Sequence, residues 1–137
     1  MPNNHATPQD AEDAYYDAIE EKDLEALMSV WERSEDILCL LPMMPAQRGA
    51  DGIRTLWEPL FKGDITLEIE IRHLHWIETD KLAIHLVEEK VSSSGQPPTP
   101  VYATNVYRKS DPGWQLLMHQ NSPTPPPPSL HVPGMEM

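Results

Sequence analysis

The stretch ITLEIEIR, residues 65–72, decides the fold, because apolar and polar side chains alternate along it. A period of two predicts a β-strand with one face toward a hydrophobic core. The alternation continues through His73, His75 and Ile77 unless a β-bulge intervenes. Glu78–Lys81 is typical of a turn and leads to Leu82–Val91, so we expect a long antiparallel hairpin here.

A second hairpin follows the first. Val101–Lys109 and Trp114–Ser122 are rich in strand-forming residues, and the segment Ser110–Gly113 between them is typical of a turn. Upstream of both hairpins, the apolar run Ile37–Leu41 is closed by Pro42 and predicts a short buried strand.

Three helices complete the pattern. Apolar residues at helical spacing predict a helix over Thr7–Lys22, with Thr7 as its N-cap. A second helix begins at Asp23, and a third runs from about Ala50, where Pro59 should kink or shorten it. The sequence therefore predicts an α+β fold in which three helices pack on an antiparallel sheet.

Composition restricts the function. The 137 residues contain 10 Lys and Arg against 22 Asp and Glu, a formal charge of −12, which disfavours nucleic acid and anionic membranes as partners. No apolar run is long enough for a membrane span. Cys39 is the only cysteine, and because it lies between Leu38 and Leu40 we expect it to be a buried apolar residue. The N-terminal residues carry no signal-peptide pattern, which favours a cytoplasmic protein.

One domain accounts for this length, and we place it at residues 1–124. Residues 125–137 are rich in proline and predict a flexible tail in extended conformation.

The order of elements resembles the nuclear transport factor 2-like superfamily, and in particular its SnoaL-like branch, over about Gln9–Pro123. Four local signatures carry the resemblance: Asp23-Leu24-Glu25-Ala26-Leu27, Gln47-Arg48-Gly49, Thr104-Asn105-Val106-Tyr107-Arg108 and Gly113-Trp114-Gln115-Leu116-Leu117. His73-Leu74-His75 and Ser122-Pro123 are also similar to the association domain of calcium/calmodulin-dependent protein kinase II. The resemblance implies a cone-shaped fold whose mouth opens between helices and a curved sheet, commonly in a dimer.

Pairing across the two turns predicts which side chains share the interior. In the first hairpin it sets Ile77 opposite Leu82, His75 opposite Ile84, His73 opposite Leu86 and Ile71 opposite Glu88. In the second it sets Asn105 opposite Met118, Tyr107 opposite Leu116 and Ala103 opposite Gln120.

Glu88 is the predicted base, because burial among apolar side chains would raise its pKa. The alternative is that Glu88 is a polar strand end paired with an Arg or Lys. The pocket arginines of the kinase association domain match Glu88 and Asn105, so the resemblance implies a neutral or acidic pocket here.

Tyr15 is the second catalytic candidate. It precedes Asp23 by eight residues, as does the tyrosine that donates to the oxyanion in the ketosteroid isomerases that the chain resembles. Those enzymes carry their base where this chain has Leu41, which cannot accept a proton, and their second acid approximately matches Asn105. The alternative role for Tyr15 is core packing.

The remaining candidates form the pocket wall. His73 and His75 lie two residues apart, a spacing suited to metal ligands, but the predicted register puts His85 on the other face and leaves only Glu88 or Gln120 as partners. We therefore predict no metal and no cofactor, with hydrogen-bonding roles for the histidines. The predicted lining residues of the ligand pocket are Trp31, Trp57, His75, Asn105, Tyr107, Met118 and Gln120.

These features predict a small-molecule pocket protein that binds, or transforms without a cofactor, an apolar compound such as a cyclic or ketone-bearing one. An isomerase-like or cyclase-like enzyme is one version. The alternative is a non-catalytic oligomerisation or regulatory module. In either case we expect a homodimer that buries the sheet face bearing Leu74, Trp76, Val87, Val106 and Leu117.

Overall fold

The structure is a computed structural model that describes residues 5–93, 97–111 and 113–122, so the predicted tail lies outside the described residues. Its elements follow one another in the order α1 (Pro8–Glu21), α2 (Leu24–Val30), β1 (Leu38–Leu40), β2 (Gln47–Arg48), α3 (Gly49–Lys62), β3 (Leu67–Glu78), β4 (Leu82–Ser93), β5 (Thr99–Lys109) and β6 (Trp114–Asn121). None of the helices in the described ranges is long and apolar enough to cross a bilayer.

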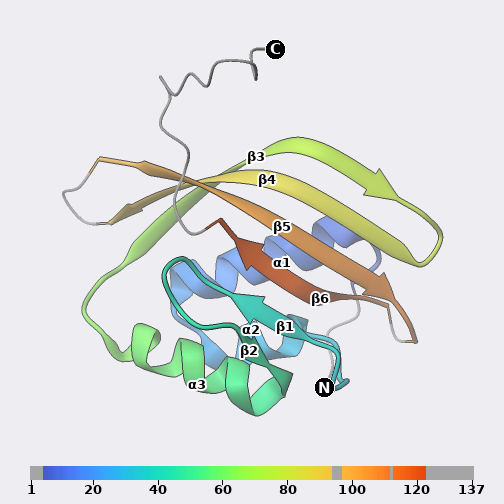
Figure 1. Cartoon of the computed structure of the whole chain (residues 1–137), viewed down its shortest axis with the longest axis horizontal. Helices are drawn as coiled ribbons and strands as arrows, with labels where there is room; N and C mark the ends of the chain where they lie inside the picture. Colours follow the sequence, from blue (N-terminus) through green and yellow to red (C-terminus); the bar gives the residue numbers. More distant parts are fainter. Residues whose placement is uncertain (1–4, 94–96, 112, 123–137) are drawn as a thin grey trace, which may run out of the picture.

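The six strands form one sheet in the order β2-β1-β6-β5-β4-β3. Figure 1 shows β3, β4 and β5 curving over α1, with α3 at the other end of the helical layer. The predicted α+β fold is confirmed, with two additions. β1 pairs in parallel with β6, so the sheet is mixed, and the two-residue strand β2 precedes α3.

The helices begin where the sequence predicts. The Thr7 side chain accepts a hydrogen bond from the Asp10 amide, and the Asp23 side chain accepts one from the Ala26 amide. Gly49 opens α3 at φ 78°, a left-handed conformation that favours glycine. α3 continues past Pro59 to Lys62, so the proline does not end it.

The core lies between the helices and the inner face of the sheet. Its largest wholly buried side chains are Trp31, Tyr15, Tyr107 and Leu27. The Tyr15 ring packs edge-on against Trp31 and Trp57, with centroids 6.1 and 6.2 Å apart. Cys39 is buried as predicted, and burial raises the pKa of its thiol to about 12.

The predicted register of the first hairpin is wrong. Ile77 pairs with Ile84 and His75 with Leu86, a shift of two residues that leaves the faces unchanged. A register shift between His73 and His75 then exchanges the faces, so that Glu89, and not Glu88, lies opposite Ile71.

The second hairpin contains the same kind of correction. Tyr107 pairs with Leu116 as predicted, but the register shifts after Val106. Asn105 consequently pairs with His119 in place of Met118, and Ala103 with Asn121 in place of Gln120. Two irregularities in the sheet therefore decide which polar side chains face the interior.

Candidate functional site

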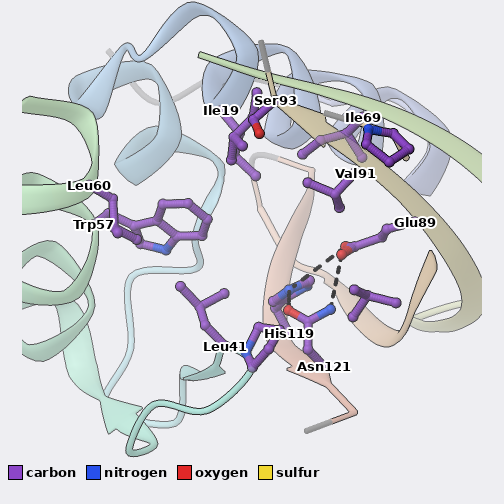
Figure 2. A pocket seen from close by; sticks show the side chains of 14 residues that line it. Ile19, Leu41, Trp57, Leu60, Ile69, Glu89, Val91, Ser93, His119 and Asn121 are labelled. Carbon is purple, nitrogen blue, oxygen red and sulfur yellow. Dashed lines mark hydrogen bonds and ion pairs between the residues drawn. The ribbon is translucent and has the colours of Figure 1, made fainter. Parts of the chain in front are cut away.

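A cavity of about 490 Å³ opens between the helices and the inner face of the sheet. Ile19, Leu41, Trp57, Ile69 and Val91 supply much of its apolar wall. Three polar side chains lie together at one side, where Figure 2 shows Glu89, His119 and Asn121 joined by dashed lines, and Ser93 lies apart from them near Ile19. A mostly apolar cavity with a few convergent polar groups is typical of a small-molecule site.

Five buried side chains from α1, β4, β5 and β6 form a closed ring of hydrogen bonds, which we call the polar ring. The Tyr16 hydroxyl donates to Glu89 Oε2 at 2.6 Å, and Asn105 Nδ2 donates to the Tyr16 oxygen at 2.9 Å. His119 Nδ1 lies 2.5 Å from Asn105 Oδ1, and its Nε2 lies 2.7 Å from Asn121 Oδ1. Asn121 Nδ2 closes the ring by donating to Glu89 Oε1 at 2.9 Å.

The directions of these bonds bear on where the proton lies. Asn121 Nδ2 also faces the Tyr102 carbonyl at 3.3 Å, and carbonyl and carboxylate oxygens only accept, so this amide has one satisfactory orientation. Both nitrogens of His119 then face amide oxygens, and a neutral imidazole can donate to only one of them. The arrangement is fully satisfied by an imidazolium balanced by Glu89, whose Oε2 lies 3.9 Å from His119 Nε2.

Burial acts in the opposite direction. It lowers the pKa of His119 below its ordinary value, against opposing contributions from Glu89 and Asn121. Burial, together with the Glu89 carboxylate, raises the pKa of Tyr16, so this hydroxyl keeps its proton and donates it. The polar ring therefore places an imidazole and a carboxylate within 3.9 Å of each other in a buried site, and these are groups that general acid–base chemistry uses.

The structure brings only some of the predicted site residues to the cavity. Trp57 lines it, and Asn105 supports it from within the polar ring. Tyr15 is wholly buried beside His119, at 5.1 Å between ring centroids, and its hydroxyl has no hydrogen-bond partner among the described residues. The hydroxyl that reaches the carboxylate belongs to its neighbour Tyr16.

Glu88 lies on the outer face of the sheet. Its carboxylate pairs with Arg72 at 3.3 Å, which is the alternative that the sequence left open. Side chains alternate along β4, so only one of Glu88 and Glu89 can face the interior. The irregularity in β3 sets Glu89 opposite Ile71, and Glu89 therefore takes the interior position.

The other predicted lining residues lie elsewhere. His75 and Gln120 are exposed, and Met118 is half-buried. Trp31 is buried in the core against Tyr15, and Tyr107 packs against His85, so neither lines the cavity.

A second cluster of polar side chains joins α1 to the β3–β4 hairpin. Glu12 Oε1 lies 2.7 Å from His73 Nε2, and Glu12 Oε2 lies 2.8 Å from His85 Nδ1. Burial raises the pKa of Glu12, but hydrogen bonds and charge from the two histidines outweigh it, so this pKa lies below its ordinary value. We call these three residues the His–Glu cluster. Among the described residues it is the group of side chains that could hold a metal ion.

The predicted subunit face also needs correction. Trp76 and Val87 pair with His85 and His73 on the inner face, so they do not share a surface with Val106. Exposed apolar side chains gather instead at the end of the β3–β4 hairpin: Leu74, Trp76, Ile77, Leu82 and Leu86.

Comparison with known proteins places this geometry in a family. A family model described as "SnoaL-like domain" matches residues 9–126. No curated protein matches the chain.

Solved structures agree with that match. A protein from Thiobacillus denitrificans, described provisionally as a calcium/calmodulin-dependent protein kinase type II association domain, is 29% identical at a TM-score of 0.83 and covers 90% of this chain and 99% of its own. A protein from Streptomyces avermitilis, described provisionally as a dehydratase of the NTF2-like family, is 27% identical at a TM-score of 0.75. The match covers 84% of this chain and 91% of that protein. A ketosteroid isomerase-like protein from Erwinia carotovora shares the fold at 20% identity and a TM-score of 0.63. The match covers 84% of this chain and 92% of that protein.

Proposed function

Because the chain belongs to the SnoaL-like domain family, whose fold commonly encloses a ligand pocket, we propose that it binds a small, largely apolar molecule and moves a proton on it without a cofactor. The observation that carries this proposal is the polar ring, which presents Glu89, His119 and Asn121 to an otherwise apolar cavity.

The volume and lining of the cavity support a small, largely apolar ligand. About 490 Å³ lies within the range of drug-sized sites and suits one or two fused rings. Trp57 and Ile69 offer apolar contacts to such a body, while polar groups gather near Glu89. A ligand with a single carbonyl or hydroxyl at one end would match this division.

The chemistry that the ring supports is proton abstraction next to a carbonyl. The Glu89 carboxylate would take a proton from carbon, and the electron pair of that C–H bond would form the double bond of an enolate. The carbonyl oxygen would gain the negative charge, and His119 could stabilise it by turning an N–H from its asparagine partner toward the ligand. If the ligand is a β,γ-unsaturated ketone, the enolate extends over the neighbouring double bond, and return of the proton to the γ-carbon would complete an isomerisation.

Deuterium incorporation tests this chemistry whatever the final product. Cyclohexanone and 2-decalone would be incubated with the protein in D₂O, and exchange beside the carbonyl would be followed by NMR. We expect the protein to accelerate exchange and Glu89→Gln to reduce the rate about a hundredfold, because an amide cannot accept the proton. Glu88→Gln is the matched control, since its side chain lies on the outer face beside Arg72. Equal rates for the two variants would contradict a role for Glu89.

A second candidate function is supported by a separate observation. The neighbour at TM-score 0.83 is described as an association domain, and the β3–β4 hairpin exposes Leu74, Ile77 and Leu86. A homodimer that covers these side chains would act as an oligomerisation or regulatory module. If neither ketone binds and the chain sediments as a dimer at micromolar concentration, this function displaces the first.

A further inference from the structure

The His–Glu cluster lies apart from the cavity and has no role in the proposed proton transfer. Its three members come from α1, β3 and β4, and one nitrogen or oxygen from each lies within 4.8 Å of the others. None of the three lines the cavity. The irregularity between His73 and His75 is what makes the cluster, because it places His73 on the inner face with His85.

The charge of the cluster is not balanced by a Lys or Arg. Glu12 is 2% exposed. Its partners include the two imidazoles, the Gln9 amide, which lies 3.1 Å from Oε1, and the Tyr107 hydroxyl. A buried carboxylate is costly without a compensating cation. A bound metal ion would supply that positive charge.

We propose that Glu12, His73 and His85 bind one divalent first-row transition metal ion, with Zn²⁺ the best match. Two imidazole nitrogens and one carboxylate oxygen are a ligand set that zinc prefers, and three protein ligands leave a fourth tetrahedral position open. On binding, the ion takes the place of the protons between the imidazole nitrogens and the carboxylate. A neutral imidazole then carries its proton on the other ring nitrogen, and an imidazolium releases one proton to solvent.

The distances are compatible with this exchange. Zinc–nitrogen and zinc–oxygen bonds of about 2.1 Å set tetrahedral ligand atoms about 3.4 Å apart. The two histidine nitrogens now lie 2.7 and 2.8 Å from different oxygens of Glu12, and one ligand atom from each residue lies within 4.8 Å of the others. Movements of about 1 Å would bring three ligand atoms to that spacing.

The surroundings hold the His85 ring in place and leave a metal ion access to the cluster past His73. His85 is wholly buried, with its ring 3.6 Å from that of Trp76 and 4.9 Å from that of Tyr107. The Tyr107 hydroxyl is buried beside the cluster, where burial and the Glu12 carboxylate raise its pKa, so it keeps its proton next to the ligands. The His73 side chain is 33% exposed and offers the route of entry.

Titration of the full chain with the metal alone tests the proposal. Chelator-treated protein would be titrated with Zn²⁺ by calorimetry, and with Co²⁺ by visible absorption and Trp fluorescence, because Trp76 stacks on a ligand. We expect one site per chain, with Co²⁺ giving the intense visible bands of tetrahedral coordination and quenching Trp emission.

Variants then locate the site. His73→Gln should weaken Zn²⁺ binding at least about tenfold, because loss of a residue that merely orients a metal ligand already costs about 10–100-fold in affinity. His75→Gln is the matched control, since His75 is an exposed histidine two residues away on the same strand. Glu12→Gln provides a second test that keeps the side-chain shape. No binding by the wild type in the micromolar range, or equal binding by His73→Gln and His75→Gln, would overturn the proposal and leave the cluster as an ion pair.

Discussion

Glu89 and Glu12 are both buried carboxylates, but their partners differ. Glu89 is bonded by a tyrosine hydroxyl and an asparagine amide, with a histidine one step further around the ring. Glu12 is bonded directly by two histidines. Hydroxyl and amide donors are not metal ligands of choice, whereas two imidazoles and a carboxylate are. The first arrangement favours movement of a proton, and the second favours exchange of protons for a cation.

Location reinforces the contrast. Glu89 lines the cavity, so a ligand can approach its carboxylate, whereas Glu12 lies outside it. Both regions depend on α1, because Glu12 and Tyr16 lie one helical turn apart on the same helix. One helix therefore supplies a carboxylate to one cluster and a hydroxyl to the other.

The largest predicted loss of unfolding free energy comes from removing the Glu89 carboxylate. Glu89→Ala leaves the Tyr16 hydroxyl and the Asn121 amide without their acceptor, and each buried orphan costs about 1–3 kcal/mol of unfolding free energy. Glu88→Ala, one residue away, removes a carboxylate whose partner Arg72 is 66% exposed. It leaves no buried donor without an acceptor and should cost less than Glu89→Ala. Urea unfolding measures both, and similar losses would show that the polar ring does not depend on Glu89.

An intermediate effect separates the two adjacent tyrosines of α1. Tyr16→Phe removes the donor to Glu89, and a hydrogen bond to a charged group contributes about 1.5–3 kcal/mol. Tyr15→Phe removes a hydroxyl that has no partner among the described residues, so its unfolding free energy should change by less than about 0.5 kcal/mol. Thermal and urea unfolding of the two variants check this, and a larger loss for Tyr15→Phe is the contrary result.

How far the sequence predicts this site depends on two one-residue irregularities. The alternation in β3 and the apolar spacing in the helices predict the elements, because burial dictates those patterns. The resemblance to the superfamily comes from the order of these elements and from four local signatures. Alternation alone cannot locate a bulge, and one bulge exchanges Glu88 for Glu89 on the inner face.

The same limitation hides the other members of the site. A shift after Val106 brings in His119 and Asn121 in place of Met118 and Gln120. The adjacent pair Glu88-Glu89 did carry a usable signal, since one of two consecutive strand residues faces the interior in either register. No comparable signal marks Glu12, whose partners lie 61 and 73 residues away in the chain.

The smallest predicted effect is the coupling between the two clusters. Glu12→Gln and Glu89→Gln keep side-chain shape while removing each charge, and a double-mutant cycle compares the paired variant with the sum of the two. Glu12 bonds to His85, which precedes Glu89 by four residues on β4, about 13 Å along the strand. The two carboxylates share no hydrogen-bond partner in the described part of the chain, so the coupling energy should stay below about 0.5 kcal/mol. Among the described residues, Tyr107 is the one whose pKa both carboxylates raise, after the larger contribution from burial. Coupling between the clusters could therefore pass through Tyr107. A coupling of more than about 1 kcal/mol that disappears in Tyr107→Phe would make the clusters one network, and the contrast between proton and cation chemistry would then fail.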